Sequence, residues 1–265
     1  MTPQHRYYRE AKDTIKEINE HKEKYVIIWY ARGKINGVQR IIGIGVNPLS
    51  GQPHYYSIQS EINSIRNSFS GTKDEYDKCE KKMLQKFYDL VRGPYREKIW
   101  LHWRMSLYNY SFFTGLEDRY KSLAGRPTGI SENSIIDVCD LFRKRYGETF
   151  VDKNKKVDGT SWRIKYLAEL NSIETAGFLE FLDEEKALND GQEDLILTSL
   201  SRKTRILEQF IDLSYKGTLK TDSNWKNIYG LSVQGLYEAF RDQWWFNLVV
   251  FLLGLILGSL FQRSC

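Results

Sequence analysis

The sequence predicts an α+β domain followed by one C-terminal transmembrane helix. Three short apolar segments separated by turns, residues 25–31, 38–46 and 54–58, predict an antiparallel meander. From residue 75 onward, helix-spaced apolar residues dominate. Residues 244–261 read WWFNLVVFLLGLILGSLF and contain no charge. The expected order of elements is three strands, a helix, a strand and further helices. This order predicts an α+β fold with a mixed sheet and flanking helices.

The residues before the first strand predict an exposed helix. Residues 1–23 are charged throughout, with Ile15 and Ile18 on the expected inner side. They contain no apolar stretch, so they do not form a signal peptide.

The first hairpin follows from the strand and turn residues. Tyr25–Ala31 is β-branched and aromatic, which predicts a strand buried on both faces. Lys34-Ile-Asn-Gly37 predicts a tight turn in which Gly37 supplies a positive φ. Asn47-Pro-Leu-Ser-Gly51 predicts the next turn, before the third short strand.

Helices and one further strand complete the domain. Glu75–Arg92 has an apolar face and ends at Gly93-Pro94. Lys98–Trp103 predicts a strand reached by a crossover connection. Further helices are expected at 110–123, 131–147, 162–170, 175–188 and 192–215. The predicted parts are an N-terminal helix (1–23), a ligand-sensing domain (24–216), a linker with an amphipathic pre-membrane helix at 231–240 (217–243), and a transmembrane helix (244–261).

The apolar C-terminal segment matches a bilayer. Eighteen helical residues span about 27 Å, close to the roughly 30 Å hydrocarbon thickness. Twelve of the eighteen are Leu, Ile, Val or Phe, and Trp244 and Trp245 suit one interface. The alternative is a buried core helix, but such helices are rarely apolar on every face. We expect a single-pass protein of the inner (cell) membrane with its N-terminal domain in the cytoplasm.

Composition excludes several classes of site. The formal net charge is +5, which permits a nucleic-acid or anionic-lipid partner without requiring one. Cys79, Cys139 and Cys265 have no metal or disulfide spacing and suit a reducing compartment. The chain has no Gly-rich phosphate loop and no G-x-S-x-G motif. We therefore expect neither a cofactor nor a metal ion.

Candidate ligand contacts cluster after the crossover strand. His102 could bind phosphate, or it could be a hydrogen-bonded structural histidine. Arg104 follows the strand end, where α/β sites usually lie, and its alternative role is a surface salt bridge. Tyr108, Asn109 and Tyr110 offer stacking rings and an amide that suit single-stranded bases. The alternative places one ring in the core and the other on the surface.

Other charged groups have structural alternatives. Arg32 and Arg40 surround the first hairpin and are candidate ligand contacts, although hairpin ends are often charged for solubility alone. Arg143–Arg145 and Arg202–Arg205 predict solvated helix faces or contacts with anionic lipid heads. Asp183–Glu185 could ligate a metal, or it could favour a helix N-terminus through the macrodipole.

The segment Ile99–Arg119, IWLHWRMSLYNYSFFTGLEDR, resembles the second motif of DnaQ-like 3′–5′ exonucleases, which have an RNase H-like fold. In that motif a strand ends in a His-Asn pair, and the following helix carries an acid, a Leu and an Arg. His102 falls at the His, and Leu116 and Arg119 fall at the later helix positions. The resemblance implies an RNase H-like domain over about residues 24–215, and it adds Arg119 to the candidate ligand contacts.

The chain departs from that family at its acidic positions. The motif acid falls near Tyr110 or Phe112, and neither is acidic. The first strand, Tyr25–Ala31, lacks the family's Asp-x-Glu, and the stretch Asp183–Phe210 lacks the His of the last motif. The family's acids hold two metal ions, so their loss implies an inactive nuclease that keeps a groove for the 3′ end of a single strand.

These observations favour a membrane effector. A cytosolic domain would bind a nucleotide or single-stranded oligonucleotide and control a homo-oligomeric pore, for instance a tetrameric ion channel. The architecture resembles membrane effectors of bacterial anti-phage (antiviral) defence, in particular the Hailong type, in which a DNA oligomer gates the effector. Gly254 and Gly258 would allow close packing of the spans, and Asn247 could hydrogen-bond between them.

Two other functions stay open at this point. The first is a membrane-tethered, metal-dependent nuclease, in which Asp140, Glu169, Asp183 and Glu184 would converge. The second is a tail-anchored adaptor without a ligand. Convergent carboxylates would favour the nuclease, and a basic aromatic groove would favour the effector.

Overall fold

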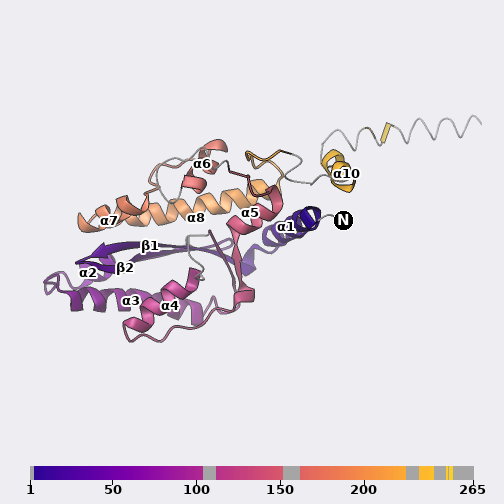
Figure 1. The fold of residues 1–265 in the computed structure, drawn as a ribbon. Coiled ribbons are helices and arrows are strands. Elements are labelled where there is room, and N and C mark those ends of the chain that lie inside the picture. Colours follow the sequence, from indigo (N-terminus) through magenta and orange to yellow (C-terminus); the bar gives the residue numbers. More distant parts are fainter. Residues whose placement is uncertain are drawn as a thin grey trace, which may run out of the picture.

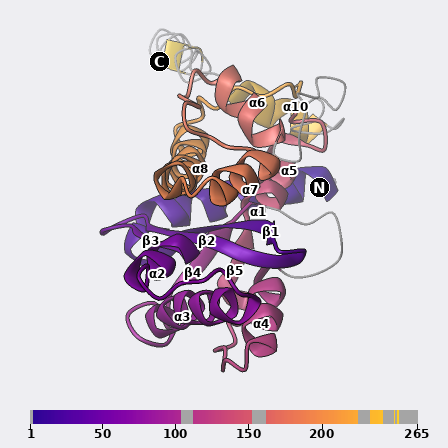
Figure 2. The same ribbon diagram turned by 90° about the vertical axis from the view of Figure 1, so that its left-hand side faces the viewer.

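The computed structural model describes residues 3–103, 112–151, 162–224, 233–241, 249 and 251–252. These residues form three layers, in which one mixed sheet lies between two groups of helices (Figures 1 and 2). The α+β class with a mixed sheet and flanking helices is therefore confirmed.

The five-stranded sheet has the order β3-β2-β1-β4-β5. Its strands are β1 (Tyr25–Ile35), β2 (Val38–Pro48), β3 (His54–Ser57), β4 (Ile99–His102) and β5 (Ile135–Asp137). The pairs β1–β2 and β2–β3 are antiparallel, whereas β1–β4 and β4–β5 are parallel. Asn36 and Gly37 both have positive φ in the β1–β2 turn, as a tight hairpin requires.

Helices α2 (Ile58–Ser64), α3 (Lys73–Arg92) and α4 (Phe112–Ser122) cover one face of the sheet (Figure 2). Thr72 and Glu75 form a reciprocal capping box at the start of α3. Trp100 of β4 packs edge-on against Phe87 of α3 and Phe113 of α4. Side chains alternate across a strand, so His102 lies on the same face as Trp100.

Helix α8 (Glu193–Tyr215) lies on β1 and β2 across the opposite face. Leu200 of α8 comes so close that a Cβ atom added to Gly43 would lie 2.8 Å from its Cδ1 atom. The absent side chain at Gly43 therefore sets the close approach of this helix. The same side carries α5 (Val138–Tyr146), α6 (Trp162–Leu170) and α7 (Phe181–Asn189), and α1 (Pro3–Glu20) packs on α5 and α8.

Three expectations are corrected. The helix expected over 131–147 is a short 3₁₀ turn (Glu132–Ser134), then β5, then α5. The expected helix over 175–188 begins only at Phe181. Ile58, expected as the last residue of the third strand, is instead the first residue of α2, whose first turn is capped by the Ser57 hydroxyl.

The C-terminal region is described in part. Helix α10 (Val233–Arg241) matches the expected amphipathic helix, and Val233 (89% exposed), Leu236, Tyr237 and Phe240 lie on its surface. Within the described part of the chain, no helix is long and apolar enough to cross a membrane. The predicted span 244–261, with Asn247, Gly254 and Gly258, lies outside the described residues except at positions 249, 251 and 252.

Candidate functional site

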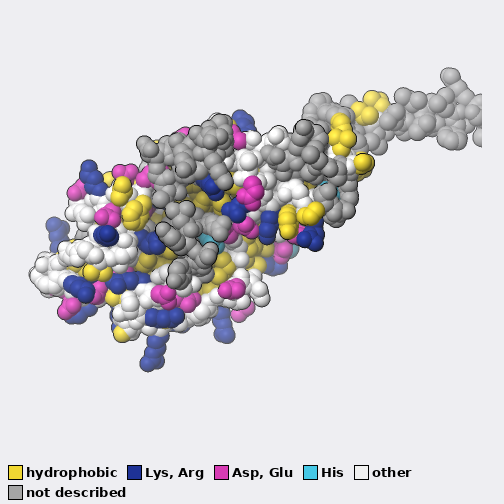
Figure 3. Space-filling model, in the orientation of Figure 1, with side chains coloured by type: hydrophobic (Ala, Val, Ile, Leu, Met, Phe, Trp, Pro, Cys, Tyr) yellow, Lys and Arg dark blue, Asp and Glu magenta, His cyan; other side chains and the backbone are white. Residues whose placement is uncertain are grey.

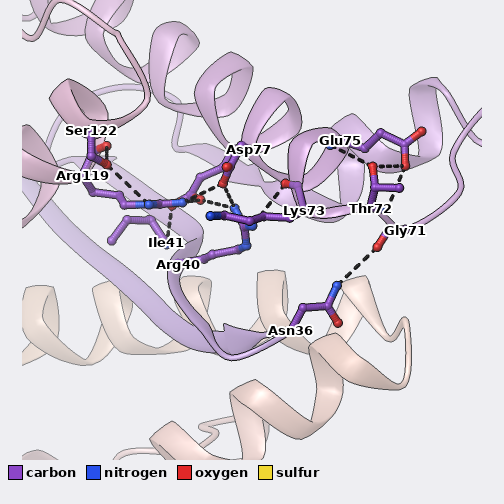
Figure 4. Close-up of polar contacts among 11 residues, drawn as sticks. Asn36, Arg40, Ile41, Gly71, Thr72, Lys73, Glu75, Asp77, Arg119 and Ser122 are labelled. Atoms are coloured by element: carbon purple, nitrogen blue, oxygen red, sulfur yellow. Dashed lines mark hydrogen bonds and ion pairs between the residues drawn. The ribbon is translucent and has the colours of Figure 1, made fainter.

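Two predicted ligand contacts, Arg40 and Arg119, meet at a pair of carboxylates on α3 (Figure 4). Arg40 Nη1 lies 2.9 Å from Glu80 Oε2 and also donates to Asp77. Arg119 binds Glu80 through two parallel bonds, Nε to Oε1 at 2.8 Å and Nη2 to Oε2 at 2.6 Å. The backbone N–H of Ile41 donates to Glu80 Oε1 as well. This cluster ties β2, α3 and α4 together.

The burial of Arg40 corrects its predicted role. Its side chain is inaccessible to solvent, and so is that of Glu80. Arg40 therefore belongs to a buried ion-pair network instead of a ligand surface or a solvated hairpin end. Although partial burial acts to raise the pKa of Asp77, hydrogen bonds and charges from Arg40 and Arg119 hold it below its ordinary value. Arg119 keeps about a fifth of its side chain exposed.

The end of β4 places His102 directly opposite Asp137 of β5. His102 is 8% exposed, and the Asp137 carboxylate accepts the N–H of Cys139 at 2.9 Å at the start of α5. Arg32 lies on β1 with its guanidinium 5.6 Å from the ring centre of Tyr30. Arg104, Tyr108, Asn109 and Tyr110 lie outside the described residues. Apart from Arg40 and Arg119, the structure does not bring the described candidates into one cluster.

Two of the four acids of the nuclease alternative, Asp140 and Glu184, have separate partners. Glu184 accepts hydrogen bonds from Lys203 Nζ at 2.6 Å and Ser199 Oγ at 2.9 Å, and all three side chains are buried. Burial raises the pKa of Glu184, with Lys203 acting in the opposite direction. Asp140 instead contacts Arg143 and Lys144 on its own helix. No group of three or more His, Cys, Asp or Glu residues in the described ranges is arranged to hold a metal ion.

Two predicted solvated cations are also buried. Lys203 lies 2% exposed, with its Nζ atom 4.8 Å from the ring centre of Phe178. Arg145 is 8% exposed, and its guanidinium stacks 4.1 Å above the ring of Tyr8. Both side chains hold helices on the α8 face of the sheet together, which the sequence did not indicate.

Sequence reasoning missed a cationic groove between α3 and the chain that follows α4. The groove is broadly open to solvent and has a volume of about 450 Å³. Figure 3 shows Lys and Arg side chains, with Asp and Glu among them, along the lower edge of the molecule, on the side where Figure 1 shows α3 and α4. Lys81, Gln85 and Arg92 share one stripe of α3, a spacing that could have indicated the groove. The groove is lined by Lys81, Gln85, Arg92, Tyr120, Ala124, Gly125, Arg126 and Pro127.

The comparisons identify no relative. No protein-family model matches the chain, and neither a curated protein nor a solved structure is significantly similar to it.

Contacts of Arg92 fix the loop that borders the groove. Its Nε atom donates to Thr128 Oγ1 at 2.8 Å, its Nη1 atom contacts Asp89 at 2.7 Å, and Nη2 donates to the carbonyl of Arg126. Tyr120 stacks on Tyr88 with ring centres 5.0 Å apart, which forms the inner wall. These contacts fix the loop after α4 against α3.

Proposed function

We propose that this chain is a membrane effector with a nuclease-inactive, RNase H-like cytosolic domain. The strand order β3-β2-β1-β4-β5, with β1–β2–β3 antiparallel and β1–β4–β5 parallel, carries the proposal because it is the arrangement expected of an RNase H-like sheet. The helices α3 and α4 on one face and α8 on the other support the same assignment.

The inactive nuclease is supported by the first strand. Val26, Ile27 and Ile28 of β1 are fully buried apolar residues where the family has its acids. A two-metal site needs carboxylates that converge on both ions. Asp140 and Glu184, two of the acids available, are instead engaged with basic side chains on different elements.

The ligand of this domain is a nucleotide or single-stranded oligonucleotide. The carboxyl ends of β4 and β5 lie side by side at His102 and Asp137, and open sheets bind ligands at this kind of edge. The chain leaves this edge directly into the segment with Arg104, Tyr108, Asn109 and Tyr110. An Arg and two Tyr rings suit the phosphates and bases of a single strand.

The output is an oligomer of membrane spans. The exposed apolar residues of α10, directly before the apolar segment, support a helix that lies at the membrane interface. A single span has no lumen, so a pore needs several copies joined at Gly254 and Gly258. A role in anti-phage defence accords with this combination of a sensing domain and a membrane output.

The test is binding by the full-length protein in detergent. Fluorescence anisotropy with single-stranded DNA and RNA oligomers should show binding that weakens as salt rises. Tyr110→Ala should weaken it by roughly 1–3 kcal/mol, while Arg96→Gln, at an exposed position away from this edge, should leave it unchanged. Mg²⁺ or Mn²⁺ should support no hydrolysis. Absence of binding at low salt overturns the proposal, and hydrolysis that is lost on Asp140→Asn or Glu169→Gln substitution favours the nuclease.

A further inference from the structure

We propose that the α3–α4 groove is a second site, which binds the phosphate groups of a nucleotide-sized ligand. Its volume of about 450 Å³ lies within the range of about 300–1,000 Å³ that is typical of small-molecule sites. The groove lies on α3 and the loop after α4, apart from the strand edge proposed for the oligonucleotide.

The groove carries more positive than negative charge. Three of the lining side chains, Lys81, Arg92 and Arg126, are cationic, and no described lining residue is acidic. Arg92 pairs with Asp89, but neither Lys81 nor Arg126 has an ion-pair partner among the residues that the structure describes. Like charges gathered around one cavity repel each other, and a bound anion would relieve this repulsion.

The neighbouring ion-pair cluster makes the contrast clear. Arg119, one residue before the groove residue Tyr120, meets the carboxylates of Asp77 and Glu80. One residue after Glu80, Lys81 faces the cavity without such a partner. The charge of Glu80 is therefore neutralised by arginine, whereas the charge of the next residue, Lys81, has no such partner and lies at the groove.

The donors of the groove fit phosphate oxygens. Lysine and arginine are the side chains that bind phosphate most strongly, and arginine does so with two parallel bonds. Each Nη atom of Arg92 makes one of its contacts to Asp89 or to the Arg126 carbonyl, which leaves each a further N–H to donate. The Gln85 amide adds a neutral donor and acceptor, while Pro127 gives an apolar surface for a sugar or base.

Backbone geometry shapes the same cavity. Ala124 adopts a left-handed conformation, φ 54°, at the end of α4, and the N–H of Gly125 donates to the Tyr120 carbonyl at 2.8 Å. A Cβ atom on Gly125 would lie 2.2 Å from the Tyr120 ring. The loop can therefore lie close to Tyr120 only with glycine at this position, and both residues line the groove.

The position of the groove favours a soluble nucleotide over a lipid headgroup. The α3–α4 layer lies across the sheet from α8, whereas α10, which leads into the predicted span, lies beyond the far end of the domain (Figure 1). A lipid phosphate would have to reach across the domain to enter the groove. The biological role of this site rests on the proposed sensing function, whereas the binding itself does not.

The experiment is titration of the full-length protein in detergent with ATP, by calorimetry without Mg²⁺. Lys81→Gln/Arg126→Gln should lower the affinity by at least about tenfold, since each loses charged hydrogen bonds. Lys186→Gln removes an exposed charge from α7, across the sheet from the groove, and should leave the affinity unchanged. Adenosine, which lacks phosphate, and sn-glycerol 3-phosphate, the phosphate portion of a lipid headgroup, are the comparison ligands.

A phosphate site in the groove predicts a specific pattern of ATP binding among these samples. Binding of ATP that is lost in the double variant, retained in Lys186→Gln and not matched by adenosine supports it. The inference is overturned if ATP does not bind at millimolar concentration, if the double variant binds ATP as well as the unaltered chain does, or if sn-glycerol 3-phosphate binds more tightly than ATP. Oligonucleotide binding is measured on the same samples to separate the two sites. If the protein binds oligonucleotide but not ATP, the groove inference fails and the proposed function is unaffected.

Discussion

The guanidinium of Arg40 and the carboxylate of Glu80 form an ion pair that is closed to solvent on both sides, with 2.9 Å between Nη1 and Oε2. Breaking a buried pair by removing one partner leaves an uncompensated charge in the core. Glu80 also accepts two bonds from Arg119, so it is the centre of the network.

We predict that Glu80→Gln lowers the free energy of unfolding by roughly 3–5 kcal/mol. Arg119→Met should lower it by less, because Arg119 is partly exposed and Arg40 still neutralises Glu80. Chemical unfolding of the full-length protein in detergent, followed by tryptophan fluorescence, measures both. Equal losses for the two variants would contradict the central role of Glu80.

Glu75 gives a prediction for pH. Hydrogen bonds from the Thr72 N–H and from Ser70 lower its pKa from the ordinary 4.5 to about 2. Because the folded-state pKa is lower than the unfolded one, the stabilisation is complete above pH 4.5 and disappears as the pH falls towards 2. Glu75→Gln keeps a capping-box side chain but removes the charge. The difference in unfolding free energy between the two proteins should therefore shrink over this pH range, and a constant difference would contradict it.

Helix α8 packs closely on β2 because Gly43 has no side chain. Gly43→Ala should destabilise the domain by about 1–3 kcal/mol, since the added methyl overlaps Leu200. Gly129→Ala is the matched control, because a Cβ atom there would have no neighbour within 4 Å among the residues that the structure describes. Thermal unfolding compares the variants, and the loss of stability in the Gly43→Ala/Leu200→Ala double variant should be smaller than the sum of the two single losses, since the added methyl then meets no Leu200 side chain. A neutral Gly43→Ala result would show that α8 shifts freely.

The predicted span can be tested by removal. Deleting Trp244–Cys265 should move the protein to the soluble fraction with its domain still folded, because no apolar span then remains. Fractionation and circular dichroism measure the two properties. A truncated chain that stays with membranes after a high-salt wash would show a second means of attachment.

Gly254 and Gly258 lie four residues apart, on one face of the predicted span. Gly254→Ile/Gly258→Ile should abolish self-association while preserving insertion, since bulky residues block close helix packing. Crosslinking and membrane depolarisation in cells are the measurements, with Leu255→Ile/Leu257→Ile as the off-face control. Persistent crosslinked oligomers in the glycine variant would place the interface elsewhere.

The hairpin and the crossover strand were predictable because their apolar runs and turn residues are local signals. Strand β5 was not, because Ile135–Asp137 is only three residues long and its pairing with β4 depends on a parallel partner distant in sequence. Ile135, its first residue, instead fits the apolar face of the helix expected over residues 131–147. Tertiary context therefore overrode the local pattern.

The candidate sites divide in the same way. Arg40 belongs to a predicted hairpin strand, but its burial depends on Asp77 and Glu80, which reach it from α3. The groove combines a stripe of α3 with a loop more than thirty residues later, so no single segment of sequence indicates it. A cluster of charged residues in the sequence predicts an exposed surface. Which of these charges are paired and buried can be seen only once the fold brings distant segments together.

The position of α8 also determines the order in which the domain can form. The β1–β2 hairpin is local and can close early, but α8, whose Leu200 rests on Gly43, comes from a distant part of the chain. Joining the two involves a large loop-closure entropy, which slows folding. Until α8 has docked, the apolar face of the sheet that it covers, including Trp29 of β1, is exposed and can contact other chains. A chain that lacks α8, because its synthesis is incomplete or because it has been cleaved, would therefore be prone to aggregate. Such a chain should need chaperones until α8 has docked on the sheet.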